Sequence, residues 1–537
     1  MSDHTATLSR PAARTVSRGD SAARLPAGLG RPLLAHAALL GIAGDTLLRE
    51  GPTGVGFSIW IALVAVALLS LAWRAERTVP AETTLWLLIA TCFASVMSWR
   101  ESTDLQQLDA LAVLASLGFA ATTLSAGGSR VLLARVRDAL LSGMHVLGAV
   151  IRGIVPLTLR ELFQAAEHDD WSGRARPAFR ATLIVGVLVL VFGSLLGSAD
   201  PIFASFVTLP DFNVGEILSH VVLIGFFAWL PGGLAIGALA EPTGAHRTSA
   251  GIRARLGLLD VTTALATLNV LFGVFMLAQL GWLFGGEAFL RARTGLSAAQ
   301  YARQGFFEMV WIVVLVMPLL LVTRALLEPG RAVLRRYTAL AIPVVVLLGA
   351  MIGSAALRMQ LYVHYYGLTL DRLDTLVFMG WLGFVLCWLA ATVLRGRPRL
   401  FVAGSTLAGF ATLAALNVFT PDVIVARENV ARAQSSGVQP LDVSYLAELG
   451  AETTDITLGA LLAPAARATT TASSRCEAAR RLLSRWGTDS SRAQALRSRD
   501  GWRTWNLGER DAMRAVQRNE KALEVIANEC PLKDPKS

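Results

Sequence analysis

Apolar runs long enough to cross a bilayer recur along this chain from Pro32 to about residue 420, separated by short polar segments. A membrane-spanning α-helix needs about 20 predominantly apolar residues to cross the roughly 30 Å hydrocarbon core. We place such runs at residues 32–48, 54–73, 82–99, 105–124, 181–199, 215–238, 262–284, 305–326, 336–357, 373–394 and 399–420. The pattern predicts an all-α polytopic integral membrane protein with about eleven transmembrane helices.

The regions around these runs differ in length and charge. Residues 1–31 are polar, carry five arginines and contain no apolar run of signal-peptide type, which is typical of a disordered basic N-terminal arm. Residues 32–124 hold the first membrane helices, and residues 181–420 hold the membrane helical core. Between them, residues 125–180 place arginines among apolar residues at helical spacing. This predicts a cytoplasmic amphipathic or interfacial segment, with a re-entrant hairpin as the alternative.

The C-terminal tail, residues 421–537, has frequent charges and only short apolar runs with helical periodicity, which predicts a small soluble helical domain. Its Trp502 and Trp505 are expected to pack inside that domain rather than to anchor at lipid headgroups. If the tail is exported, an oxidising compartment permits a disulfide between Cys476 and Cys530. Two free thiols remain the alternative.

Composition supports the membrane assignment. Of 537 residues, 54% are hydrophobic and 16% charged, against about 25% charged in soluble globular proteins. Only Lys521, Lys533 and Lys536 among the basic residues are lysines, which excludes a P-loop lysine or a kinase strand lysine upstream of them. The net charge of +10 arises mostly from arginines in short loops. We therefore expect the lipid bilayer, and not nucleic acid, to be the partner.

The arginines are distributed asymmetrically between alternate loops. With the N-terminus in the cytoplasm, the inner segments carry 25 arginines and the outer segments 7. Because cytoplasmic loops are enriched in basic residues, this bias predicts a cytoplasmic N-terminus and, with an odd number of spans, an external C-terminus.

No strong catalytic signature is present: the chain lacks HExxH, CxxC and GxSxG motifs, and we expect neither a metal nor a cofactor. Glycine pairs four residues apart within spans, such as Gly233/Gly237 and Gly349/Gly353, predict close helix packing. Pro231 predicts a kink in its span rather than a break. Asn269 and Asn417 are expected to form hydrogen bonds between helices.

Polar residues gather at the ends of spans on the predicted outer side, where ionisable groups are costly and so become site candidates. Besides Asp45 in the first run, the candidates are Asp200, Tyr301, Arg303, Glu308, Arg358, Tyr362, His364, Tyr365, Asp371 and Arg372. In a functional interpretation, Arg358 or Arg372 holds an anionic group and His364 or Asp200 exchanges a proton. In the structural interpretation, which we favour, the tyrosines form an aromatic belt and the charges pair with one another.

Several of these stretches resemble a family of bacterial integral membrane proteins, the domain of unknown function DUF4173, also labelled DUF4153-like. The resemblance covers roughly residues 180–460 and rests on the stretches at 197–203, 301–308, 365–372, 417–422, 426–432 and 441–446. At residue 304 the family usually has a second arginine, whereas this chain has Gln304. The resemblance implies a bacterial polytopic membrane protein and carries over no activity.

These observations favour a non-enzymatic protein of the bacterial cell envelope, either a transporter-like body or a scaffold that recruits envelope partners through its tail. The competing class is a membrane-embedded enzyme that acts on a lipid-linked or anionic substrate at the outer leaflet. Its candidate residues are Asp200, Glu308, His364 and Arg358.

Overall fold

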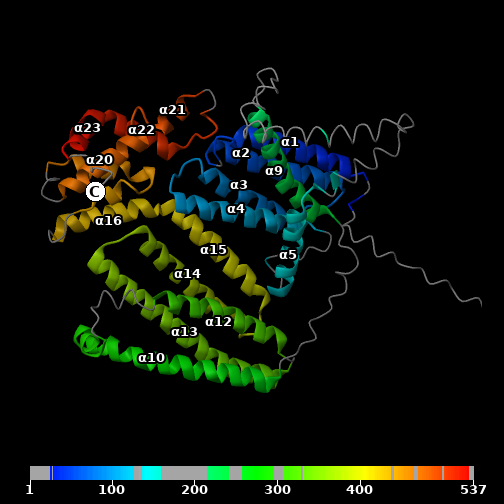
Figure 1. Ribbon diagram of the computed structural model, residues 1–537. Coiled ribbons are helices and arrows are strands. Elements are labelled where there is room, and N and C mark those ends of the chain that lie inside the picture. The colour runs from blue at the N-terminus through cyan, green and yellow to red at the C-terminus, as the bar shows by residue number, and fades with distance from the viewer. Residues whose placement is uncertain are drawn as a thin grey trace, which may run out of the picture.

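The computed structural model describes residues 25–26, 28–51, 53–125, 132, 136–155, 157–158, 185, 214–240, 257–294, 306–327, 330–436, 441–464, 470–498 and 501–530. Within these ranges the protein is α-helical and has no β-strand. Three hydrophobic cores divide it into two bundles of membrane helices and a C-terminal helical domain (Figure 1).

The first bundle forms around a core that contains the fully buried Trp86 and Ile61. Its helices are α1 (Gly30–Leu48), α2 (Val55–Arg74), α3 (Ala81–Val96), α4 (Thr103–Leu124) and α9 (Val214–Leu239), with α5 (Val136–Arg152) packed on α9. Helix α5 lies in the segment predicted to be amphipathic. Helix α9 is continuous through Pro231, so this proline does not break the helix.

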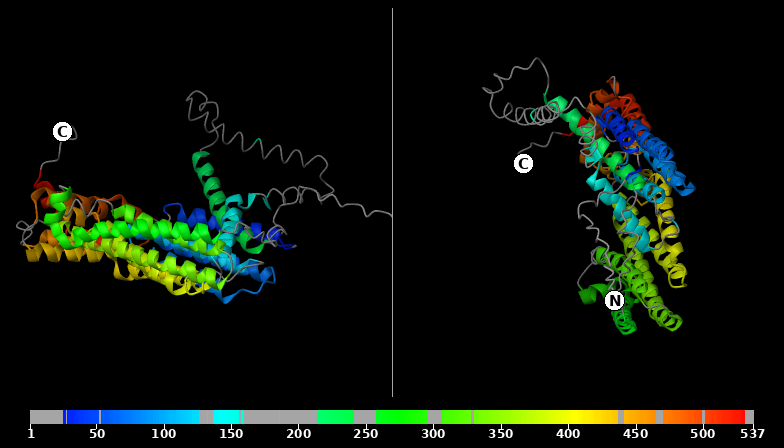
Figure 2. Two further views of the ribbon diagram at one scale, coloured as in Figure 1. Left: turned by 90° about the horizontal axis from the view of Figure 1, so that it is seen from below. Right: turned by 90° about the vertical axis from the view of Figure 1, so that its right-hand side faces the viewer.

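The second bundle has its own core around Leu348 and Met351, both fully buried. Its helices are α10 (Leu258–Thr294), α12 (Phe306–Leu326), α13 (Arg331–Tyr366) and α14 (Leu370–Thr392). Helix α15 (Arg399–Phe419) runs between the two bundles, and most membrane helices share a common direction (Figures 1 and 2). The Phe410 ring of α15 lies 5.4 Å from that of Trp86, so aromatic packing joins α15 to the first bundle.

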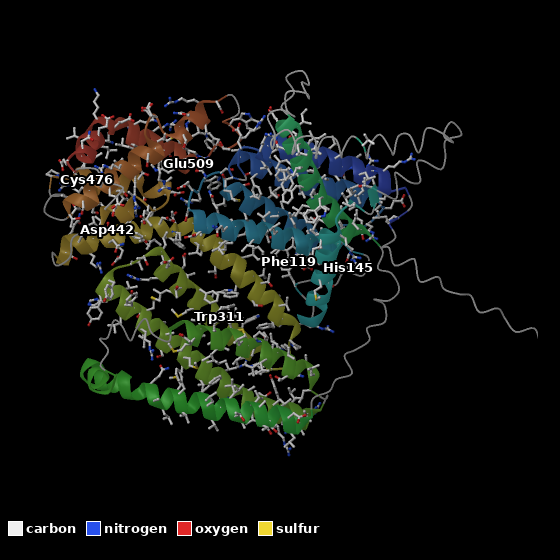
Figure 3. All side chains as sticks on the ribbon, viewed as in Figure 1. Phe119, His145, Trp311, Asp442, Cys476 and Glu509 are labelled. Atoms are coloured by element: carbon white, nitrogen blue, oxygen red, sulfur yellow. A yellow bond between two sulfur atoms is a disulfide. The ribbon has the colours of Figure 1, made fainter. Side chains whose placement is uncertain are left out.

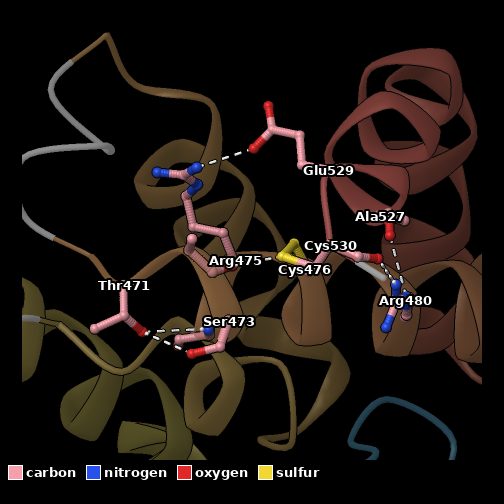
Figure 4. The surroundings of a disulfide bond; sticks show 10 residues. Thr471, Ser473, Arg475, Cys476, Arg480, Ala527, Glu529 and Cys530 are labelled. Carbon is pink, nitrogen blue, oxygen red and sulfur yellow. Dashed lines mark hydrogen bonds and ion pairs between the residues drawn. A yellow bond between two sulfur atoms is a disulfide. The ribbon is translucent and has the colours of Figure 1, made fainter. Parts of the chain in front are cut away.

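The C-terminal domain continues directly from α15. Its elements are α16 (Pro421–Ser436), α17 (Val443–Leu446), a 3₁₀ turn (Ala451–Thr453), α18 (Thr454–Leu462), α20 (Ala472–Trp486), α21 (Ser491–Arg497), α22 (Leu507–Arg518) and α23 (Glu520–Asn528). A disulfide between Cys476 and Cys530, with a Cα–Cα distance of 6.2 Å, links α20 to the end of α23 (Figure 4). Next to it, the Arg480 guanidinium donates to the carbonyl oxygens of Ala527 and Cys530.

The predicted membrane runs coincide with described helices except for the run at 181–199, of which only residue 185 is described. By length and composition, eight helices of the described part qualify as membrane spans: residues 55–74, 104–124, 215–239, 258–279, 308–326, 331–366, 370–392 and 399–419. Helix α3 is a shorter apolar helix of 16 residues, about 24 Å long. The protein is therefore a multi-pass membrane protein, and the count of about eleven spans stays a prediction.

The tyrosine-rich stretch between the predicted runs at 336–357 and 373–394 is mostly helical. Helix α13 continues to Tyr366, and only residues 367–369 link it to α14. At 36 residues, α13 is about 54 Å long and exceeds the hydrocarbon thickness. The polar residues of this stretch therefore occupy the last two turns of a long helix.

The predicted hydrogen bonds between helices are confirmed. The Asn269 amide nitrogen donates to the carbonyl oxygen of Leu340 at 2.9 Å and so joins α10 to α13. The Asn417 amide nitrogen donates to the buried Asp109 carboxylate at 2.7 Å and so joins α15 to α4. Because an unsatisfied polar group is costly in hydrocarbon, these bonds fix which helix faces meet.

The glycine pairs behave differently from one another. A Cβ on Gly233 would lie 2.7 Å from the Cα of Val150, so this glycine lets α5 approach α9 closely, as predicted. Gly353, by contrast, has open space on its Cβ side, so the pair with Gly349 is not a site of close approach. Spacing alone does not distinguish the two cases, because it does not reveal what lies opposite.

Candidate functional site: the junction of the C-terminal domain with the membrane helices

The C-terminal domain contacts the membrane region through the α1–α2, α3–α4 and α13–α14 links. The arginine distribution predicted that these links and the tail lie on the same side of the membrane. The structure brings all of them to one end of the molecule. Whether that end is external stays a prediction.

The first contact caps the beginning of α2. The first N–H groups of a helix have no partner within the helix. Here the Gly56 amide donates to the carbonyl oxygen of Arg503 at 2.8 Å, and the Val55 amide donates to that of Trp505 at 3.3 Å. The backbone of the C-terminal domain thus completes a membrane helix.

Gly54 makes this approach possible. It has a φ of +87°, and a Cβ at this position would lie 2.7 Å from the backbone carbonyl carbon of Thr504. Only glycine tolerates both the left-handed backbone and the close contact. Trp502, predicted to pack within the domain, is instead about half exposed beside this contact.

The second contact caps the end of α3. The Asn506 side-chain amide donates to the carbonyl oxygens of Met97 at 3.1 Å and Arg100 at 2.7 Å, and the Leu507 amide donates to that of Ser98 at 2.9 Å. Carbonyls at a helix end lack intrahelical partners, so Asn506 satisfies groups that the helix leaves open. Asn506 is itself buried at 2% exposure.

An ion pair reinforces the same junction. The Arg485 guanidinium donates to both carboxylate oxygens of Glu101 at 3.2 Å. The Ala451 amide donates to the Glu101 carboxylate, and the Glu101 amide donates to the Glu452 carboxylate. Burial raises the pKa of Glu101 to about 7, although Arg485 acts in the opposite direction. The ionised pair is therefore held at a cost in desolvation.

Two further carboxylates lie against this ion pair. Asp422 is 1% exposed and accepts a hydrogen bond from the Gly450 amide at 2.9 Å. Its second oxygen and Glu452 Oε2 are buried and have no hydrogen-bond partner in the described structure. Burial also raises the pKa of Glu452. Among the described residues no group of acids, histidines and cysteines has the arrangement of a metal site.

The third contact fastens the link between α13 and α14. Asn429 of α16 pairs with the Leu368 backbone, accepting from its amide at 3.2 Å and donating to its carbonyl at 2.7 Å. The Leu370 amide donates to the Tyr445 hydroxyl at 3.0 Å. Preceding them, Gly367 has a φ of +83° and leaves no room for a Cβ beside Asn429. The domain thus binds both bundles.

The predicted aromatic and basic candidates form a group at the end of α13. Tyr362 and Tyr366 have ring centroids 4.9 Å apart, and the Arg372 guanidinium carbon lies 4.4 Å above the Tyr362 ring. His364 and Tyr365 make an edge-to-face contact at 5.6 Å. These are cation–π and aromatic contacts between neighbours on the surface.

The remaining candidates are scattered. Arg358 is one turn further from the end of α13 and buried in the second bundle at 4% exposure. Glu308 is exposed in the first turn of α12, and Asp371 is exposed in the first turn of α14. Three candidates lie outside the described residues: Asp200, Tyr301 and Arg303.

Sequence reasoning did not single out Asn506, Glu101 or Arg485. A weak signal exists for Asn506, because it stands three residues before Glu509 in an N-cap pattern and accepts from the Glu509 amide at 3.3 Å. Glu509 lies where α22 meets the first bundle and receives a bidentate contact from Arg492 (Figure 3). That pattern reveals a helix start, but it does not indicate that the Asn506 amide nitrogen binds another helix.

A family model for a domain of unknown function, DUF4153, matches residues 83–458. The chain belongs to the DUF4153 family. No match was found among curated proteins or among solved structures. The resemblance stated from the sequence named DUF4173 first and began near residue 180, so the family was close but its name and its start are corrected.

The DUF4153 region runs from α3 to α18 and includes most of the membrane helices. Several stretches that carried the resemblance meet at the junction, since Asn429, Tyr445 and Asp422 contact the α13–α14 link or the turn at Gly450. Helices α1, α2 and α20 to α23 lie outside the matched residues. In this DUF4153 protein those flanking parts bind each other at Gly56 and Arg503.

Proposed function

We propose that this DUF4153 protein is a non-enzymatic scaffold of the bacterial cell membrane that presents its C-terminal domain to envelope partners on the external side. The observation that carries the proposal is the attachment of that domain. Its backbone completes the beginning of α2 and the end of α3, and Asn429 fastens it to the second bundle. A domain held at three links keeps a fixed orientation above the membrane.

The exposed side of the domain offers a surface for such a partner. Arg510, Arg514 and Arg518 are exposed at four-residue spacing along α22. Asp511 lies 3.4 Å from Arg514 and forms an ion pair with it. Residues four apart lie on one face of a helix. This stripe suits an acidic partner.

The alternative classes find less support. The cavity between α1, α2 and α9 measures about 10 Å³ and is lined mainly by apolar residues such as Leu40 and Val64. That volume holds at most about one water molecule, so this cavity is a packing gap. A wider pocket of about 760 Å³ lies along α10, and apolar residues such as Val270, Leu271 and Leu340 form much of its lining. For the enzyme, Glu308 and His364 lie at the starts and ends of different helices and are both exposed.

A pair of glycine variants tests the scaffold. Gly54→Ala forces a Cβ into the Thr504 backbone and should detach the domain from α2, whereas Gly396→Ala adds a Cβ at a similar φ of +79° with open space around it. We expect Gly54→Ala to lose the ability to restore the envelope phenotype of a deletion strain, while Gly396→Ala keeps it. Both variants carry the cost of a positive φ, and the ψ of −164° at Gly54 adds backbone strain to the Thr504 contact, so Gly396→Ala controls for a left-handed turn that makes no contact with the domain.

The same assay distinguishes the enzyme. If Gly54→Ala complements the deletion strain although its 501–508 peptide is exposed to hydrogen exchange, function does not need a docked domain and the scaffold proposal is wrong. Loss of function in both His364→Ala and Glu308→Gln, with the domain still docked, would support the enzyme instead.

A further inference from the structure

A cluster of ionisable side chains lies between α1 and α9, at the ends of these helices nearest the C-terminal domain. Asp45 is buried at 3% exposure one turn before the end of α1. Its Oδ2 lies 2.5 Å from His220 Nδ1, and its Oδ1 lies 3.1 Å from Arg49 Nη1. Arg49 also donates to the Ser219 hydroxyl. Asp45 stood out in the sequence, but its partner on α9 did not.

Helix packing does not require this cluster. A Cβ on Gly41 would lie 2.5 Å from the carbonyl oxygen of Ile224, and a Cβ on Gly44 would lie 2.4 Å from the Phe227 side chain. These close apolar contacts already hold α1 against α9. Ionisable groups at membrane depth cost free energy, so a cluster that packing does not need indicates a function.

The hydrogen-bond geometry determines which imidazole nitrogen is free. Arg49 Nη1 lies 2.9 Å from the same His220 Nδ1 that contacts Asp45. Nδ1 cannot both accept a hydrogen bond from Arg49 and donate one to Asp45. Because the Asp45 carboxylate can only accept, Nδ1 carries a hydrogen and donates it to Asp45. Nε2 is then the basic nitrogen. The His220 side chain is 42% exposed, so the described helices do not enclose the ring.

Charge makes the arrangement sensitive to one more proton. With a neutral His220, the charges of Asp45 and Arg49 cancel. Protonation at Nε2 places a second cation 2.9 Å from Arg49, and both cations then compete for one carboxylate. Arg49 follows the last residue of α1, and its side chain is 29% exposed.

Within the described part of the chain, the surrounding elements contribute few other charges. Glu50 follows Arg49, and Glu216 lies one turn before His220 on α9; both are exposed. On α4, which also packs on α9, Asp109 is held by Asn417. Helix α2 carries no charged residue before its last position, and α5 packs on the other half of α9.

We propose that Asp45, Arg49 and His220 form a proton-binding site that is open to the same side as the C-terminal domain. His220 Nε2 takes up the proton, Asp45 orients the ring through Nδ1, and Arg49 yields its place on the carboxylate. Because residues 49–53 lead directly to the Gly54 contact, proton uptake alters the segment on which the C-terminal domain is docked. The site stands independently of the scaffold proposal.

Hydrogen–deuterium exchange at the imidazole C2 position, resolved for each histidine by mass spectrometry, tests the site. The full-length protein is placed in phosphatidylcholine nanodiscs and measured from pH 5 to 9. We expect a sigmoidal profile for His220. Asp45→Asn removes an anion beside the ring, so the half-maximal point should move to a proton concentration at least about threefold higher. Arg49→Gln removes a cation, so the half-maximal point should move to a lower proton concentration.

Asp109→Asn is the matched control, since it removes another buried carboxylate of the same bundle and should leave the His220 profile unchanged. A flat His220 profile overturns the proposal. So do Asp45→Asn and Arg49→Gln profiles that both superimpose on the wild type. If Asp45→Asn does not fold, the Arg49→Gln profile alone decides between these outcomes.

Discussion

At the scale of single residues, the junction depends on groups that complete another element's hydrogen bonds. Asn506 satisfies carbonyls at the end of α3, and Asn429 pairs with the backbone of Leu368. Each net hydrogen bond of this kind contributes about 1 kcal/mol, and the loss of a partner for a buried group costs about 1–3 kcal/mol. The carboxylates are different, because Glu101 is stabilised by Arg485 and destabilised by its own burial.

Glu101 predicts a pH dependence of docking. Its pKa rises from 4.5 to about 7 on burial, so the docked state binds more protons than the undocked state between these values. Docking should therefore be strongest below pH 4.5 and weaken as the pH rises through 7, by about 3 kcal/mol from this group. Hydrogen exchange of the Leu507 and Gly508 amides at pH 5.5 and 8, corrected for intrinsic rates, measures it.

Glu101→Gln should remove most of that dependence, because glutamine keeps the hydrogen-bond acceptor and does not ionise. Burial also raises the pKa of Glu452 and Glu509, so a smaller trend of the same sign should persist. Protection that increases with pH in the wild type would contradict the prediction.

At the scale of elements, the C-terminal domain is stabilised by contacts between helices distant in sequence. Helices α20 and α23 pack together and are linked by the disulfide between Cys476 and Cys530, two residues that are 54 positions apart along the chain. At the start of α17, Asp442 caps the helix; burial alone would raise its pKa, but hydrogen bonds from Ser444, Tyr445 and Ser474 together lower it. Helix caps such as Asp442 and the disulfide cross-link therefore stabilise a domain made of mostly short helices.

The disulfide predicts a redox-dependent stability of this domain. A loop of this length loses enough entropy on cross-linking to give about 4 kcal/mol of stabilisation in the chain-entropy account. Cys476→Ser should lower the temperature at which the domain unfolds, and a reductant should do the same to the wild type. The double variant Cys92→Ala and Cys387→Ala, which removes two free exposed thiols, serves as the control. Equal melting curves for all proteins would rule out a stabilising bridge.

At the scale of the whole molecule, the C-terminal domain joins two bundles that otherwise meet mainly through α15. It binds the first bundle at α2 and α3 and the second at the α13–α14 link. A change in the relative position of the bundles must therefore strain the junction. The DUF4153 match stops within α18, so helix α20, which carries Arg485, and the turn that carries Arg503 lie outside the matched residues and brace the membrane helices from there.

Orientation is tested by cysteine accessibility in a background without Cys92 and Cys387. Asp511→Cys on α22 and Arg395→Cys after α14 are both exposed positions and lie at opposite ends of the membrane helices. The positive-inside bias predicts that a membrane-impermeant maleimide labels Asp511→Cys in intact cells and labels Arg395→Cys only after lysis. The reverse pattern would place the C-terminal domain in the cytoplasm.

The amino-acid sequence by itself determined the helical membrane class, nearly every described membrane helix, and the common side of the links that meet the tail. These follow from apolar length and arginine placement, which are local properties of the chain. It also indicated Asn417 as a residue that binds a neighbouring helix.

Only the tertiary structure decided which groups hold the protein together at its junction. The hydrogen bond from the Gly56 amide to the Arg503 carbonyl joins positions more than 400 residues apart. Because backbone N–H and C=O groups are the same at every position, no residue type in the sequence marks this bond. The partnership of Asp45 with His220 is likewise invisible in the sequence, because it depends on the glycines of α1 packing against α9 and not on any spacing along the chain.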